Sequence, residues 1–112
     1  MSLTEADVRR LERGGHRDFC RQEADGTIRL RNLEGHCVFL QGGRCVAYPD
    51  RPDGCALYPL IWYTEDREAG LHDFCPHRHE FRFSQGDREW LKRSIAAEDA
   101  EVAARHRLPL VD

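Results

Sequence analysis

Several features of membrane and secreted proteins are missing from this sequence. Its 112 residues contain no apolar run that approaches the length of a membrane helix, which needs about 18 residues or more. The first seven residues lack the basic and apolar regions of a secretory signal. We therefore expect a cytoplasmic protein, in which cysteine thiols stay reduced.

The sequence has no excess of positive charge either. It contains 17 basic and 20 acidic residues, which gives a formal net charge of −3. Nucleic-acid binding depends mainly on the neutralisation of phosphates by Lys and Arg, so we expect no nucleic-acid partner, and also no membrane; a protein partner stays open. Nothing resembles a nucleophile triad, a phosphate-binding loop, a pair of catalytic carboxylates or an internal repeat, so no enzyme activity is indicated.

Cysteine, by contrast, is abundant for a chain of this size. There are five cysteines, an odd number that cannot be fully paired within one chain. No CxxC pair is present, which weakens the case for a thiol-redox motif. A domain of this length buries only about two-thirds of the surface of its unfolded chain. A metal cross-link would therefore add usefully to its stability.

Two segments carry the signals of helices. In the first, the side chain of Thr4 can cap the helix with Asp7 as its reciprocal partner, and Gly14 lies where the helix would end. The second has start signals near Ser84, and its helical pattern covers residues 87–105. Both predicted helices flank the cysteine-rich middle of the chain.

The middle of the chain has strand and turn signals. Residues 27–31 alternate apolar and polar side chains, as a half-buried strand does. Residues 37–40 and 45–48 are short apolar runs on either side of a glycine-rich turn, which predicts a small hairpin. The proline-rich residues 49–59 should be irregular but stiff, and residues 60–63 read as another strand.

These elements predict an α+β fold. It is a small metal-stapled domain in which N- and C-terminal helices flank a short antiparallel sheet and Cys-rich loops. We expect residues 1–112 to form a single cysteine-cluster domain.

Four cysteines lie in surroundings that suit metal ligands: Cys37, Cys45, Cys55 and Cys75. Glycine closely precedes the first three, which lets the backbone approach an ion. Proline follows the fourth, as in the ligand loops of some iron–sulfur proteins. Four thiolates form a closed site, which favours structural zinc or an iron–sulfur cluster over catalytic zinc. The cofactor expected is one zinc ion, with a 4Fe-4S cluster or iron as the alternative.

The other candidate ligands have weaker support. Cys20 follows Phe19 and precedes the first predicted strand, so we expect it to pack as a small apolar residue. A fifth ligand or a reactive thiol is the alternative for Cys20. His77 and His79 are candidates to replace one cysteine in a Cys₃His zinc site.

Three stretches of the chain carry a family motif. Residues 35–40 (GHCVFL), 45–48 (CVAY) and 51–59 (RPDGCALYP) resemble, in order, the YkgJ-type cysteine-cluster family, whose members are described as chelating zinc or iron. The resemblance implies a family core over about residues 35–76. The CxxCxxxCC cluster that full members carry before their N-terminal helix is absent from this chain, so only the second half of the family's cysteine set is present.

Three functions are compatible with these patterns. The first is a metal-binding protein with one Cys₄-type site and no assigned reaction. The second is a thiol redox or iron–sulfur electron-transfer protein; as a thiol enzyme it would need an exposed thiolate of low pKa. The third is a non-metal interaction domain, in which Trp62, Tyr63 and Phe74 would form a partner surface.

Overall fold

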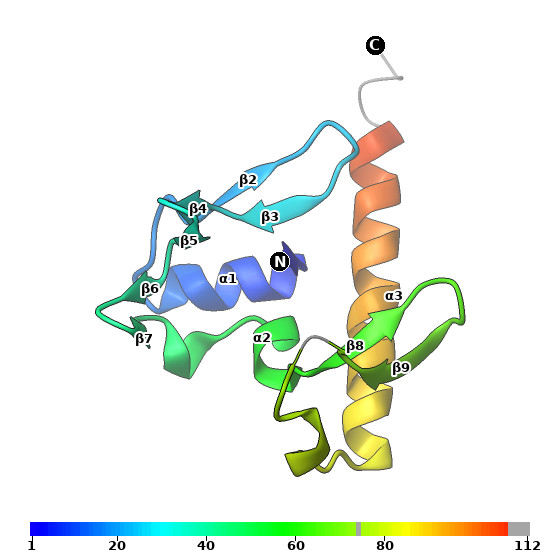
Figure 1. The fold of residues 1–112 in the computed structure, drawn as a ribbon. Helices are drawn as coiled ribbons and strands as arrows, with labels where there is room; N and C mark the ends of the chain where they lie inside the picture. Colours follow the sequence, from blue (N-terminus) through cyan, green and yellow to red (C-terminus); the bar gives the residue numbers. More distant parts are fainter. Residues whose placement is uncertain (74, 108–112) are drawn as a thin grey trace.

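The fold is mixed α+β, as predicted. The computed structural model describes residues 1–73 and 75–107, and within them three α-helices accompany several small antiparallel sheets (Figure 1). Helices lie at both ends of the described chain. None of the helices in this part of the chain is long and apolar enough to cross a membrane. Phe74 and the proline-containing C-terminal residues 108–112 fall outside the described residues.

Helix α1 (Glu5–Arg13) forms where its capping signals predict it. Thr4 accepts a hydrogen bond from the backbone of Asp7, and the Asp7 carboxylate accepts one from the backbone of Thr4, so the predicted capping box is present. The helix ends at Gly14. Its inner face buries Leu11 completely, which fixes α1 against the first hydrophobic core.

A three-stranded antiparallel sheet covers this core. It has the order β1 (Ser2–Leu3), β3 (Ile28–Leu30), β2 (Cys20–Gln22). Strand β3 lies within the segment predicted from alternation. The core between sheet and helix contains Leu3, Leu11, Phe19, Leu30, Phe39 and Ala47, all buried.

Two very short hairpins follow the sheet and differ from the prediction. Strand β4 (Asn32–Leu33) pairs with β5 (His36–Cys37), and β6 (Leu40–Gln41) pairs with β7 (Arg44–Cys45). The glycine-rich turn is where we expected it, but the pairing involves two residues on each side of it. The apolar runs instead leave the ladders to fill the core, since Phe39 and Ala47 are buried there.

The proline-rich segment is more ordered than predicted. It contains a 3₁₀ turn, η1 (Tyr48–Asp50), and a short helix, α2 (Asp53–Leu57). Proline occupies an early position in each: Pro49 lies in the first turn of η1, and Pro52 is the N-cap of α2. Because proline suits the first turn of a helix, the residues that stiffen this loop also start its helices.

The last part of the chain builds a second core. Strand β8 (Leu60–Tyr63) forms as predicted and pairs with β9 (Glu68–Leu71), which was not predicted. After a 3₁₀ turn, η2 (Arg78–Glu80), helix α3 (Gln85–Arg107) covers and extends beyond the predicted range. Its first half packs on the β8–β9 hairpin and its C-terminal end lies beside the β2–β3 turn (Figure 1). Leu57, Leu60 and Leu91 form this second core.

Candidate metal centre

Cys37 and Cys45 occupy matching positions in the two short hairpins. Cys37 pairs with Asn32 in the first ladder, and Cys45 pairs with Leu40 in the second, so each cysteine is the last residue of its ladder. The two hairpins therefore repeat one eight-residue unit, although the sequence shows no evident repeat. The repeat is hard to recognise in the sequence because most of the side chains at matching positions of the two hairpins differ.

The turns of the two hairpins are also alike. Glu34 and Gly35 have φ values of 54° and 81°, and Gly42 and Gly43 have φ values of 59° and 78°. Two central residues with positive φ characterise the type I′ turn, whose twist matches that of paired strands. This turn type fixes the register of each hairpin. The positions of the two cysteine backbones thus follow from local geometry.

Both cysteines face the same core. Two residues beyond Cys37 lies Phe39, and two residues beyond Cys45 lies Ala47; both of these side chains are buried in the first core. Cys37 and Cys45 are half-buried and pack against this core.

Cys55 reaches this core from helix α2. Its backbone N–H donates to the carbonyl of Pro52 at 3.0 Å, so it lies in the first turn of the helix. The end of α2 is held by Leu57, which is buried in the second core. The Cys55 side chain is half-buried and packs against the first core, as Cys37 and Cys45 do.

The pKa of the Cys55 thiol is raised by its surroundings. Burial raises the pKa of its thiol, and the negative charges that Cys37 and Cys45 would carry raise this pKa further. Asp7 acts in the same direction, and the N-terminal ammonium group opposes it. Together with Asp7 and the N-terminus, Cys37 and Cys45 therefore make up the charged surroundings of the Cys55 thiol.

Cys75 lies in the turn that follows β9. Its N–H donates to the carbonyl of His72 at 3.2 Å. The ring of His72 hydrogen-bonds through Nδ1 to the Tyr58 hydroxyl at 2.7 Å. The backbone N–H of His72 donates to the carbonyl of Pro59 at 2.7 Å. Tyr58 is the C-cap of α2. The segments that carry Cys55 and Cys75 are therefore tied together.

The arrangement of the donors stops short of a formed metal site. Within residues 1–73 and 75–107, no group of three His, Cys, Asp or Glu side chains is arranged to hold a metal ion. The chemistry of the donors nevertheless fits zinc or iron, because thiolates are soft ligands that these metals accept.

The comparison with protein families bears directly on this cluster. Residues 1–85 match the family model CxxCxxCC, described as "Putative zinc- or iron-chelating domain". The chain belongs to this family. A search of curated proteins and a search of solved structures each returned no match.

Membership in the CxxCxxCC family supports a metal-binding role. The matched span contains all five cysteines and ends where α3 begins. It agrees with the resemblance to YkgJ-type proteins that the motifs around Cys37, Cys45 and Cys55 carry. The family description covers zinc and iron alike.

The other candidate ligands are one cysteine on the same core and two histidines at the surface. Cys20 is in β2, half-buried against the first core, and burial together with the charge of Glu12 raises the pKa of its thiol. His77 is exposed and its Nδ1 lies 2.6 Å from a carboxylate oxygen of Glu80. His79 is exposed as well. Cys20 thus has the packing role predicted for it, while the two histidines lie at the surface.

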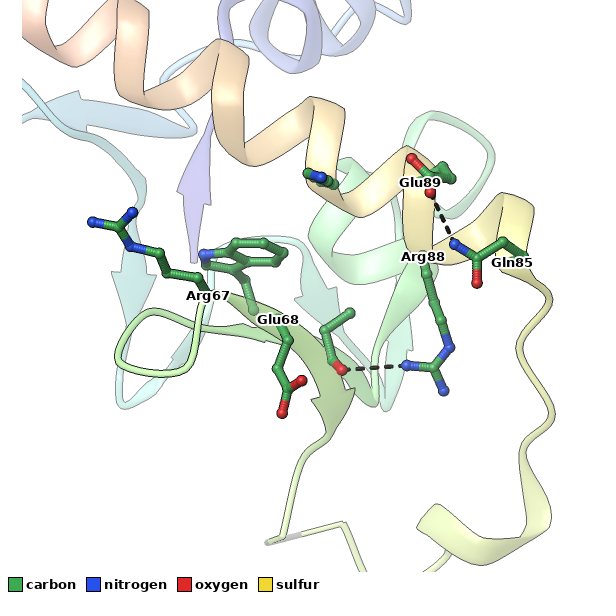
Figure 2. Close-up of a pocket in the computed structure, with 8 residues that line it drawn as sticks. Arg67, Glu68, Gln85, Arg88 and Glu89 are labelled. Atoms are coloured by element: carbon green, nitrogen blue, oxygen red, sulfur yellow. Dashed lines mark hydrogen bonds between the residues drawn. The ribbon is translucent and has the colours of Figure 1, made fainter.

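A polar pocket of about 280 Å³ lies between β9 and the start of α3. Figure 2 shows Arg88 reaching from α3 to the carbonyl of Ala69, at 3.2 Å, and Gln85 reaching Glu89, at 2.8 Å. No cysteine lines the pocket. The bond from Arg88 joins α3 to the hairpin, the bond between Gln85 and Glu89 lies within α3, and half-buried Trp62 packs against the second core. We therefore interpret the pocket as part of the packing of α3.

One residue near the cluster has a role that the sequence did not reveal. The carboxylate of Asp7, which is 2% exposed, accepts a hydrogen bond from the backbone N–H of Asp53, the first residue of α2, at 3.1 Å. Its only sequence signal was its position in the capping box of α1. A contact between residues 46 positions apart leaves no trace in a local pattern.

Proposed function

We propose that the chain is a metal-binding domain that holds one zinc ion through Cys37, Cys45, Cys55 and Cys75. The observation that supports this most is that the chain belongs to the CxxCxxCC family, and that Cys37, Cys45 and Cys55 all pack against the first core. The fourth thiol is proposed from its sequence context and from the tie between His72 and Tyr58. We also infer a reducing compartment such as the cytoplasm, because the ligands must stay reduced.

A structural role follows from where the thiols are anchored. Two of them lie on hairpins with few other contacts, one lies on a five-residue helix, and one lies in a turn. An ion bound there would supply the cross-links between these segments. In small zinc-binding peptides such binding contributes about 10–16 kcal/mol of apparent free energy at neutral pH. The chain's own residues hold the sulfurs in place and shield them from water.

The raised pKa values of Cys20 and Cys55 disfavour these two thiols as redox nucleophiles. Such a role requires an exposed thiolate of lowered pKa beside a resolving cysteine. Burial instead raises the pKa of Cys55 and of Cys20. Both thiols are therefore poor nucleophiles at neutral pH in the metal-free chain.

The test is a metal analysis of protein purified without oxygen. Zinc, iron and acid-labile sulfide are measured per chain, and the absorption spectrum is recorded. We expect a colourless protein with one zinc. A brown protein with iron and sulfide would replace zinc by a cluster, and a folded protein with neither metal would refute the proposal.

Single substitutions then test the ligand set. Cys37→Ala, Cys45→Ala, Cys55→Ala and Cys75→Ala should each lower the zinc content. Normal zinc affinity in Cys75→Ala alone would remove Cys75 from the set and leave three thiols.

A further inference from the structure

Helix α2 cannot fix its own position. It has only five residues, and isolated helices shorter than about 12 residues are marginal in water. Its N-cap is Pro52, which makes no side-chain capping bond. The N–H groups at its start therefore need acceptors from elsewhere in the chain. Cys55 lies in this first turn, so any movement of the start of α2 moves the Cys55 thiol.

The missing cap comes from α1. One oxygen of the Asp7 carboxylate, Oδ1, accepts from the N–H of Asp53 at 3.1 Å, while the other, Oδ2, accepts from the N–H of Thr4 at 3.0 Å. A single buried carboxylate thus caps two helices. Arg10 completes the arrangement, because its Nη2 donates to Asp7 Oδ1 at 2.7 Å.

Arg10 also holds the chain immediately before and at the start of α2. The same Nη2 donates to the carbonyl of Arg51 at 2.8 Å and lies 3.3 Å from Oδ1 of Asp53. Pro52, between these two residues, is buried. Three consecutive residues are therefore held against α1 just before the cysteine.

Substitution of Asp7 or Arg10 would leave several polar groups without partners. Removing the Asp7 carboxylate would leave the N–H groups of Thr4 and Asp53 without their acceptor, and each such loss costs about 1–3 kcal/mol when the group is buried. It would also remove the nearer of the two carboxylates that pair with the Arg10 guanidinium. Cys37 and Cys45 lack any such dependence, since their hairpins set their positions.

We propose that Asp7 and Arg10 are positioning residues that place the Cys55 thiol beside Cys37 and Cys45. The effect on metal binding rests on the proposed function, whereas the placement of the thiol in the metal-free chain does not. The prediction is that breaking the pair separates Cys55 from the other two thiols while α1 and both hairpins stay folded.

The chain contains a matched control for this experiment. Ser84 and Asp87 form a second capping box, at the start of α3, with distances of 2.9 Å and 3.1 Å. Asp87→Ala removes a capping carboxylate as Asp7→Ala does, but the contacts of Asp87 do not involve α2. Arg10→Met removes the bonds of Arg10 to Asp7, Arg51 and Asp53 and leaves the α1 capping box intact, so it remains informative if Asp7→Ala unfolds. Arg10→Lys keeps a cation and serves as the rescue.

Two measurements are made on these variants at a temperature where circular dichroism shows them folded. The first is zinc affinity, by competition with a chelator, with the thiolate absorption of bound Co²⁺ as a check on the ligands. Asp7→Ala and Arg10→Met should bind about tenfold or more weakly. Arg10→Lys should recover most of the affinity, and Asp87→Ala should match the wild type.

The second measurement needs no metal. A short thiol-specific cross-linker is applied to the metal-free chain, and mass spectrometry measures the yield of Cys55 joined to Cys37 or Cys45. We expect lower yields in Asp7→Ala and Arg10→Met than in Asp87→Ala. Equal yields in all these variants would overturn the inference. If the wild type binds no metal, the proposed function fails and the cross-linking result alone decides the positioning role.

Discussion

Cys37 and Cys45 are eight residues apart and hold the same place in two hairpins of identical register. Each follows a type I′ turn and each precedes, by two residues, a side chain buried in the first core. The turn sets the register of the ladder, and the register sets the side to which the cysteine points. The geometry of these turns should therefore matter both for stability and for the metal.

The turn glycines provide the first prediction. Gly35→Ala and Gly43→Ala should each destabilise the fold by about 1–2 kcal/mol, because both residues have positive φ, which costs a side-chain-bearing residue about that much. An added Cβ would meet no other atom within 4 Å at either site, so strain and not a clash is tested. Urea unfolding measures the loss.

Gly86→Ala is the control for these two substitutions. Gly86 is in α3, and an added Cβ there would make only an ordinary contact of 3.5 Å with Ser84. Alanine should leave the stability unchanged or raise it by up to about 1 kcal/mol. Equal losses in all three variants would contradict the assignment of the turns.

The second prediction separates the proposed ligands from the packing cysteine. Cys55→Ala should lower zinc content and melting temperature together, whereas Cys20→Ala should lower stability only modestly and leave zinc content unchanged. The reason is that Cys55 lies in the family motif that also contains Cys37 and Cys45, whereas Cys20 lies in β2, outside that motif. Metal analysis and thermal unfolding are the measurements. Similar behaviour of the two variants would show that Cys20 is also a ligand.

The third prediction concerns the pH dependence of Cys20. Burial, aided by Glu12, raises the pKa of its thiol, so folding favours the neutral form. The stability that this thiol contributes is complete below the pKa of an unfolded cysteine and is lost as pH rises through the higher folded pKa. The difference in unfolding free energy between wild type and Cys20→Ala should therefore shrink from pH 7 to alkaline pH.

Alkylation kinetics give an independent check on Cys20. Its reaction with iodoacetamide should be slow at neutral pH and should accelerate only above the usual thiol range. Glu12→Gln should move the onset toward lower pH, because it removes a negative charge that raises the pKa. An unchanged profile in Glu12→Gln would argue against this electrostatic contribution.

The fourth prediction tests the tie between Tyr58 and His72. Tyr58→Phe removes the hydroxyl that lies 2.7 Å from Nδ1 of His72 and keeps the ring. The loss in stability should stay below about 1.5 kcal/mol, since Tyr58 is exposed. Zinc dissociation should nevertheless accelerate if Cys75 is a ligand, because its turn begins at His72.

Tyr48→Phe is the matched control. Arg51 lies over the Tyr48 ring at 4.0 Å, a contact that phenylalanine retains. Zinc dissociation in this variant should equal that of the wild type. Equal rates in Tyr58→Phe and Tyr48→Phe would mean that the tie does not support the metal site.

Much of the fold could be predicted because its signals are local. The capping box of Thr4 and Asp7, the strand at residues 60–63 and the long C-terminal helix all depend on residues within a few positions of one another. The hairpins were harder. The sequence suggested that two apolar runs pair, but residues such as Phe39 are more stable in the core than in a two-residue ladder.

The candidate site shows the same division. Glycine and proline near the cysteines indicated metal ligands, and Cys37, Cys45 and Cys55 pack against the first core. The ligand set itself stays a prediction. The identity of the metal and the role of Cys75 stay predictions. The support of α2 by Asp7 was not predictable, because a carboxylate in a capping box looks complete within its own helix.

The hairpins and the α2 anchor also imply an order in which the donors are set. Cys37 and Cys45 are placed by contacts that close within a few residues, whereas Cys55 depends on a contact that spans 46 residues. Short loops close faster than long ones. A metal ion present while the chain folds would therefore first meet the thiols of Cys37 and Cys45. The later docking of α2 would add Cys55 and strengthen the binding.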